Sequence, residues 1–112
     1  MDKLDKYRNL VVQMLENHYR PVAVTDEIEM QILIDRQHDH YQLLHVGWRD
    51  GEHPVYGCVV HVDIKNGKIW IQRDFTEDGV ALELMEAGVP KEDIVLAFQS
   101  PYKRQFTDFA VA

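Results

Sequence analysis

The chain is poor in residues that several kinds of function require. Cys58 is its only cysteine, which excludes an internal disulfide and a multi-cysteine zinc site. Ser100 is its only serine, so serine-based catalysis has almost no scope. The glycines are scattered, and no glycine-rich phosphate-binding loop can be recognised. Cys58 alternates with apolar residues on a predicted strand, which favours a buried small side chain over a nucleophile.

Long apolar runs are also lacking. Runs such as Val59-Val60 are far shorter than the roughly 20 residues that span a bilayer. The charged opening MDKLDKYR does not have the form of a signal peptide. Together with the single cysteine, these features predict a soluble protein of the reducing cytoplasm. With 112 residues, of which 46% are hydrophobic and 28% charged, we expect one globular domain over residues 1–112.

Basic residues are the third shortage. The chain has 12 lysines and arginines against 19 acidic residues, and its formal net charge is −7. DNA binding draws affinity from basic groups that displace counterions from phosphates. The charge balance therefore disfavours direct DNA binding by the lone chain and favours protein partners. The short tail segment PYKRQF, with Lys103 and Arg104 between two aromatic residues, is too small to reverse this balance.

The spacing of apolar residues changes along the chain. Steps of three and four predict a first helix over residues 2–19, with Asp2 as its N-cap and Arg20-Pro21 as its end. Alternation then predicts strands over about 28–35 and 40–48 and a turn over 49–52.

Two more strands and a second helix follow. Strands are predicted over 55–64 and 69–73, joined at Asn66-Gly67, which is the strongest short hairpin signal. Thr76 is predicted to cap a helix that ends at Gly88. PKEDIVLAF then predicts a turn and a short strand, followed by an ordered but irregular tail. The expected fold class is α+β: an N-terminal helix, a four-stranded antiparallel meander sheet, a second helix and a short C-terminal strand and tail.

The two faces of this sheet can be assigned from the hairpin. A two-residue Asn66-Gly67 turn sets Ile64 opposite Ile69. The predicted core face comprises Val60, Val62, Ile64, Ile69, Ile71 and, by alternation, Leu44, Val46 and Trp48. The predicted opposite face comprises Leu33, Tyr41, Leu43, His45, Val59, His61, Asp63, Trp70 and Gln72.

This opposite face is too apolar for open water. We expect either the second helix or another chain to cover it. Tyrosine and tryptophan are frequent anchors of protein interfaces. The candidate partner interface is therefore Tyr41, Leu43, His45, His61 and Trp70.

The segment RQHDHYQLLHVGW, residues 36–48, concentrates histidines and raises the question of a metal site. Metal binding needs three or four ligands that converge on one point. Asp35, His38 and His40 lie near the connection of the first two strands, whereas His45 points to the other face of a regular strand. We prefer the interpretation that these histidines lie on strand faces and bind no metal or cofactor. The alternative interpretation is a metal-dependent hydrolase or nuclease using Asp35, His38 and His40. Asp63-Ile64-Lys65 has the spacing of a nuclease half-motif, but it runs directly into a hairpin turn.

Five segments together carry a resemblance to a known family: MDKLDKYR, DHYQLLHVGW, VYGCVVHVDIKNGKIWIQ, EAGVPKEDIVLAF and PYKRQFTDFAVA. They resemble the XisI family, the fdxN element excision controlling factors of cyanobacteria, over nearly the whole chain. The resemblance implies an accessory role in the developmental, site-specific excision of a DNA element, alongside a XisH-type partner and a separate recombinase that performs the strand chemistry. It implies no catalytic motif. We therefore predict a non-enzymatic regulatory factor that contacts a XisH-type protein, with self-association as the other use of the apolar face.

Overall fold

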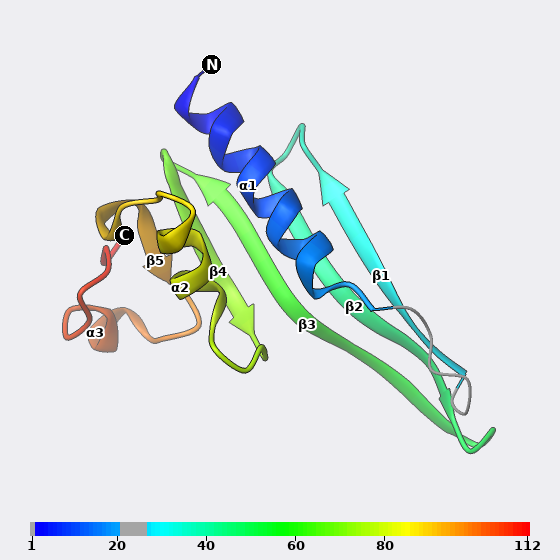
Figure 1. Cartoon of the computed structure of the whole chain (residues 1–112). Coiled ribbons are helices and arrows are strands. Elements are labelled where there is room, and N and C mark those ends of the chain that lie inside the picture. Colours follow the sequence, from blue (N-terminus) through cyan, green and yellow to red (C-terminus); the bar gives the residue numbers. More distant parts are fainter. Residues whose placement is uncertain (1, 21–26) are drawn as a thin grey trace.

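A five-stranded sheet forms the centre of the computed structural model, which describes residues 2–20 and 27–112 (Figure 1). The strands are neighbours in chain order: β1 (Glu27–Asp35), β2 (His40–Arg49), β3 (His53–Lys65), β4 (Lys68–Asp74) and β5 (Ile94–Leu96). Each of the first four is antiparallel to the next, and β5 is parallel to β4. The predicted α+β class and four-stranded meander are confirmed, and the short C-terminal strand extends the same sheet.

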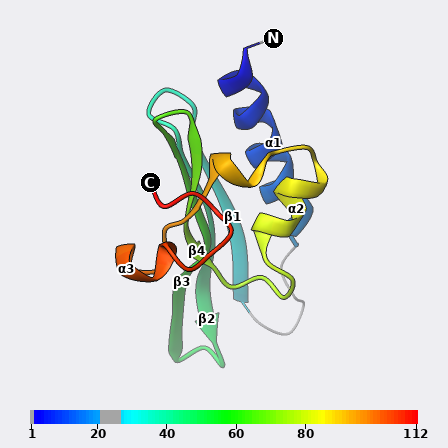
Figure 2. The ribbon, with the colours of Figure 1, turned by 90° about the vertical axis from the view of Figure 1, so that its left-hand side faces the viewer.

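The helices lie on both sides of the sheet. Figure 2 shows α1 (Lys3–His18) and α2 (Val80–Glu86) against one face, which we call the inner face, and α3 (Pro101–Arg104) against the other, which we call the outer face. A short 3-10 helix, η1 (Lys91–Asp93), leads into β5. Within the residues that the structure describes, no helix is long and apolar enough to cross a membrane.

Local signals set the ends of α1 as predicted. The carboxylate of Asp2 accepts a hydrogen bond of 2.8 Å from the backbone N–H of Leu4, which satisfies one of the free donors of the first turn. Tyr19 follows the last helical residue as C-cap. Pro21 lies outside the described residues. The helix buries one stripe of side chains: Tyr7, Val11, Met14 and Leu15.

The turn between β3 and β4 also follows the prediction. Asn66 and Gly67 both have positive φ angles, 54° and 76°, as the two central residues of a type I′ hairpin turn require. Ile64 consequently pairs with Ile69, and Val62 pairs with Ile71. These pairs fix the register of the hairpin and bring large aliphatic side chains onto one face.

The start of the second helix differs from the prediction. Thr76 does not cap it, because the helix begins only at Val80. Asp74 takes the capping role instead, since its carboxylate accepts hydrogen bonds from the backbone N–H groups of Thr76, at 2.9 Å, and of Val80, at 2.8 Å. The predicted end is confirmed: Gly88 has a φ of 103°, and the N–H of Val89 bonds to the carbonyl of Leu84.

The inner face is the core of the molecule. Its buried strand residues are Tyr41, Leu43, Val60, Val62, Ile64, Ile69 and Ile71. Tyr41 pairs with Val62 and Leu43 pairs with Val60, so the predicted inward positions of Leu44, Val46 and Trp48 were wrong. These three alternate with the true core residues of β2 and take the outer face.

A β-bulge also disturbs the alternation of β3 itself. Leu43 pairs with Val60 while the next residue, Leu44, pairs with Cys58, so Val59 is an extra, unpaired residue of β3. A bulge shifts the alternation of the strand that carries it by one position. The inward and outward positions of β3 therefore exchange at Val59. A strict alternation of inward and outward residues along the sequence does not predict this exchange.

Candidate functional site

The five residues of the predicted partner interface do not share one surface. Tyr41 and Leu43 are completely buried in the core, both with 0% exposure. His45 occupies the same side of β2 as these two, opposite Met30 of β1. Only His61 and Trp70 lie on the outer face. The predicted interface is thus wrong as a set, because alternation alone had assigned Tyr41, Leu43 and His45 of β2 to the outer face.

Trp70 is covered by its own chain. Its exposure is 8%, and its indole N–H donates to the carbonyl of Lys65 at 3.1 Å. Two cations lie over the indole ring. The Nζ atom of Lys65 is 4.0 Å from the ring centroid, and the guanidinium carbon of Arg104 is 5.6 Å from it. Arg104 belongs to α3 and also donates to the carbonyls of Ala97 and Gln99. The C-terminal segment, rather than the second helix, therefore closes this part of the outer face.

Tyr41 is held in the core by a polar link. Its hydroxyl donates to the Asp39 carboxylate at 2.8 Å, and the same carboxylate accepts from Arg8 of α1 at 2.8 Å. The Arg8 guanidinium holds the pKa of Asp39 below its usual value, and burial raises the pKa of Tyr41. This link joins α1 to the β1–β2 connection, and its role is structural.

The three residues of the predicted hydrolase site lie near one another, since Asp35 of β1 pairs with His40 of β2, but their side chains are engaged in two different contacts. His38 pairs with Asp35 at 2.9 Å, and Asp35 also accepts from the backbone N–H groups of Gln37 and His38 in the turn. His40 instead pairs with Asp63 on the neighbouring strand. Lys65 of the half-motif stacks on Trp70. The metal-dependent hydrolase using Asp35, His38 and His40 is therefore not supported.

A different cluster of ionisable side chains forms on the outer face, and we call it the His–Asp–His cluster. His40 of β2 pairs directly with Asp63 of β3, and His61 precedes Asp63 by two residues. Asp63 Oδ1 lies 2.8 Å from His40 Nδ1 and 2.9 Å from His61 Nε2. The hydrogen bond to Asp63 raises the pKa of His40. Sequence reasoning missed this cluster, because only the β2–β3 register places His40 beside Asp63.

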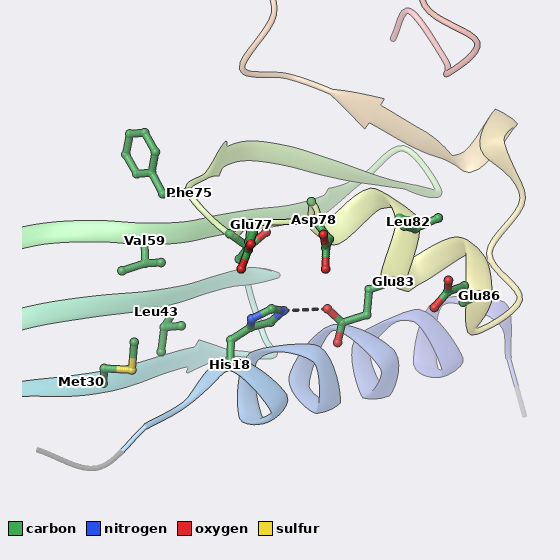
Figure 3. Close-up of a pocket in the computed structure, with 12 residues that line it drawn as sticks. His18, Met30, Leu43, Val59, Phe75, Glu77, Asp78, Leu82, Glu83 and Glu86 are labelled. Carbon is green, nitrogen blue, oxygen red and sulfur yellow. Dashed lines mark hydrogen bonds and ion pairs between the residues drawn. The ribbon is translucent and has the colours of Figure 1, made fainter.

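A pocket of about 540 Å³ opens on the inner side, between the end of α1, the sheet and the segment leading into α2 (Figure 3). We call it the acidic pocket. Its floor is apolar and consists of Met30, Leu43 and Val59. Its rim carries four carboxylates, those of Glu77, Asp78, Glu83 and Glu86. No lysine or arginine is among the described residues that line it.

One rim carboxylate is already engaged. Glu83 lies 2.7 Å from Nε2 of His18 and accepts from the side-chain amide of Asn17, so it ties α2 to the end of α1 (Figure 3). Glu77, Asp78 and Glu86 are exposed. An apolar floor below exposed carboxylates suits a group with an apolar stem and a cationic end, such as a lysine or arginine side chain.

Comparison with known proteins defines the class. The family model described as XisI protein matches residues 1–111, so the chain belongs to the XisI family. No curated protein is similar enough to count as a match.

Two solved structures from Anabaena variabilis ATCC 29413 share the fold and much of the sequence. One, described as a XisI-like protein, is 47% identical with a TM-score of 0.90, and the match covers 97% of this chain and 99% of that one. The other, described as fdxN element excision controlling factor XisI, is 38% identical with a TM-score of 0.87, and the match covers 99% of this chain and 100% of that one. The family resemblance expected from the sequence is confirmed.

Proposed function

We propose that this chain is a non-enzymatic accessory factor that helps control the site-specific excision of a DNA element by binding a XisH-type protein. One observation carries the proposal: a relative described as an excision controlling factor is 38% identical over its whole length. Such a factor acts where the DNA is, in the cytoplasm, and leaves strand cleavage to a separate recombinase.

The acidic pocket supports a protein partner of basic character. The net charge of −7 repels phosphate and attracts a positively charged protein surface. The pocket offers exposed carboxylates around an apolar floor, which matches a lysine or arginine side chain presented by the partner. We therefore place the contact with the XisH-type protein at this pocket, in place of the sheet-face interface predicted from the sequence.

The proposal is tested first by measuring molar mass in solution. The chain and a XisH-type protein from the same genome are passed, alone and mixed, through size exclusion with light scattering. A stable mixed complex is the expected result. A mixture that elutes as two separate species would overturn the proposal, and a homodimer in that case would assign the contact surface to self-association.

Charge variants test the place of contact. Glu77→Lys with Asp78→Lys reverses two exposed rim carboxylates, and we expect the affinity for the partner to fall at least about tenfold. The control, Glu29→Lys with Glu52→Lys, makes the same charge change at exposed positions of β1 and the β2–β3 turn. The control should lose no more than about threefold at physiological salt, where distant charges are screened. Equal losses would remove the pocket from the proposal.

A further inference from the structure

We propose that the His–Asp–His cluster of His40, His61 and Asp63 binds one divalent transition-metal ion of the zinc type. The site lies on the outer face and differs from the predicted hydrolase trio, of which it shares only His40. The proposal concerns metal binding by the lone chain. It goes beyond the proposed function, and it does not depend on any partner.

The ligand set has the composition of known zinc sites. Two imidazole nitrogens and one carboxylate oxygen are ligands that Zn²⁺ accepts, at about 2.0–2.2 Å from the ion. One ligand atom from each of the three residues lies within 4.8 Å of the other two. The ligand atoms of a tetrahedral ion are about 3.3–3.5 Å apart, given those bond lengths. Small side-chain rotations therefore bring the three atoms to the required spacing.

The strands themselves hold these ligands in place. His40 and Asp63 are directly paired residues of β2 and β3, and His61 lies on the same face of β3. Strand residues are more rigid supports than loop residues, so little conformational entropy is lost when an ion binds. In the metal-free form the two rings share Asp63 Oδ1 through hydrogen bonds, and an ion would replace the protons in these contacts.

Two glutamines supply the outer layer of contacts that metal ligands need. Gln72 donates from Nε2 to Asp63 Oδ2 at 3.3 Å, which leaves Oδ1 turned toward both histidines. Gln42 lies 3.5 Å from Nδ1 of His61, where its amide can orient the ring so that Nε2 faces the site. Gln72 follows Trp70, the strand partner of Asp63, by two residues, and it is the extra residue of a bulge in β4, since His61 pairs with Arg73 and Val62 with Ile71.

The local charge favours a cation. The Asp63 carboxylate lies within the cluster, 2.8 Å from His40, and Asp35 is the directly paired neighbour of His40 on β1, so two carboxylates lie close to the position of the ion. The Asp63 side chain is 16% exposed, whereas that of His40 is 59% exposed. The part of the site next to Asp63 is thus enclosed, whereas the part next to His40 is open. The coordination positions of the ion that no side chain occupies would face solvent and be filled by water.

The experiment measures Zn²⁺ binding by the full chain, stripped of metal and carrying no polyhistidine tag, by titration calorimetry at pH 7.5 and pH 6.0. We expect one saturable site per chain, with weaker affinity at pH 6.0 because the histidines must lose their protons to bind metal. His40→Ala should weaken binding by at least about 100-fold, since even outer-layer residues contribute about 10–100-fold. Co²⁺ should give the absorption of a site with nitrogen and oxygen ligands.

His38→Ala is the matched control. His38 is two residues from His40 and is also exposed and paired with a carboxylate, but it lies outside the cluster. It should leave the affinity unchanged. Asp63→Asn serves as the second test variant, and circular dichroism verifies that each variant is folded. Absence of saturable binding up to about 100 μM Zn²⁺, or equal binding by wild type and His40→Ala, would overturn the proposal and leave a purely hydrogen-bonded cluster.

Discussion

The two faces of the sheet are formed by the same strands but differ in the side chains that they carry. The inner face is closed: its aliphatic side chains pack against α1 and α2, and the buried hydroxyl of Tyr41 is satisfied by Asp39. The outer face combines the hydrogen-bonded His–Asp–His cluster with partly exposed apolar side chains such as Leu33 and Trp48. Stability therefore depends mainly on the inner face, and the outer face is free to carry ligand chemistry.

Two leucines on adjacent strands give the sharpest contrast. Leu43 is completely buried on the inner face, whereas Leu33 on the outer face is 44% exposed. Leu43→Ala should lower the free energy of unfolding by about 2–5 kcal/mol, because it removes buried surface and leaves a cavity. Leu33→Ala should cost less than about 1 kcal/mol. Urea denaturation measures both, and equal losses would contradict the assignment of the two faces.

The polar link at the edge of the core should show in the pH dependence of stability. The pKa of Asp39 is lowered in the folded state by Arg8, so its stabilisation is present above the usual aspartate value and is lost as the pH falls through the lowered one. Asp39→Asn should cost about 1–3 kcal/mol at pH 7 and flatten this acidic part of the profile. Asparagine tolerates the positive φ of 59° at this position. Urea midpoints measured from pH 2.5 to 7 test this, and an unchanged profile would refute it.

The contacts by which α3 covers the outer face can be removed by a substitution. Arg104→Ala takes away two hydrogen bonds to carbonyls and the cation above Trp70, so we expect a loss of about 1–2 kcal/mol and greater access of quencher to the indole. Lys103→Ala, at an exposed neighbouring position, is the control. Quenching is measured in a Trp48→Phe background, which leaves Trp70 as the only tryptophan. A Trp70 signal that is unaffected by Arg104→Ala would show that other groups close this face.

The smallest effect concerns His40. Its raised pKa means that folding favours the protonated ring. The resulting contribution to the stability of the folded protein is present below the usual histidine pKa of about 6.5 and is lost as the pH rises through the raised pKa. NMR titration of metal-free protein should therefore find the His40 pKa above that value. Asp63→Asn should return it toward the usual range. A His40 pKa that is the same in both proteins would exclude Asp63 as the cause.

Much of the fold could be predicted, because its signals are local. The capping of α1 by Asp2 depends on residues two positions apart, and the Asn66-Gly67 turn is determined by backbone preferences at two residues. Thr76 shows the limit of such signals, since a capping residue in the right context was displaced by Asp74, whose carboxylate reaches Val80 six residues further on.

The candidate site could be predicted only in part. The sequence indicated that the histidine-rich segment lies on a strand and that the chain has an acidic surface. It could not indicate that His40 meets Asp63, because these residues are 23 positions apart and their contact depends on the register of β2 with β3.

By itself, the sequence determined the order and type of the main elements, the charge and the family, because each depends on composition or on neighbouring residues. The tertiary structure decided which side of β2 is buried, where Val59 and Gln72 bulge, and that α3 covers Trp70. The physical reason is that a one-residue change of register, or one extra residue in a strand, exchanges the two faces of that strand, and only the packing of whole strands and helices selects the stable arrangement.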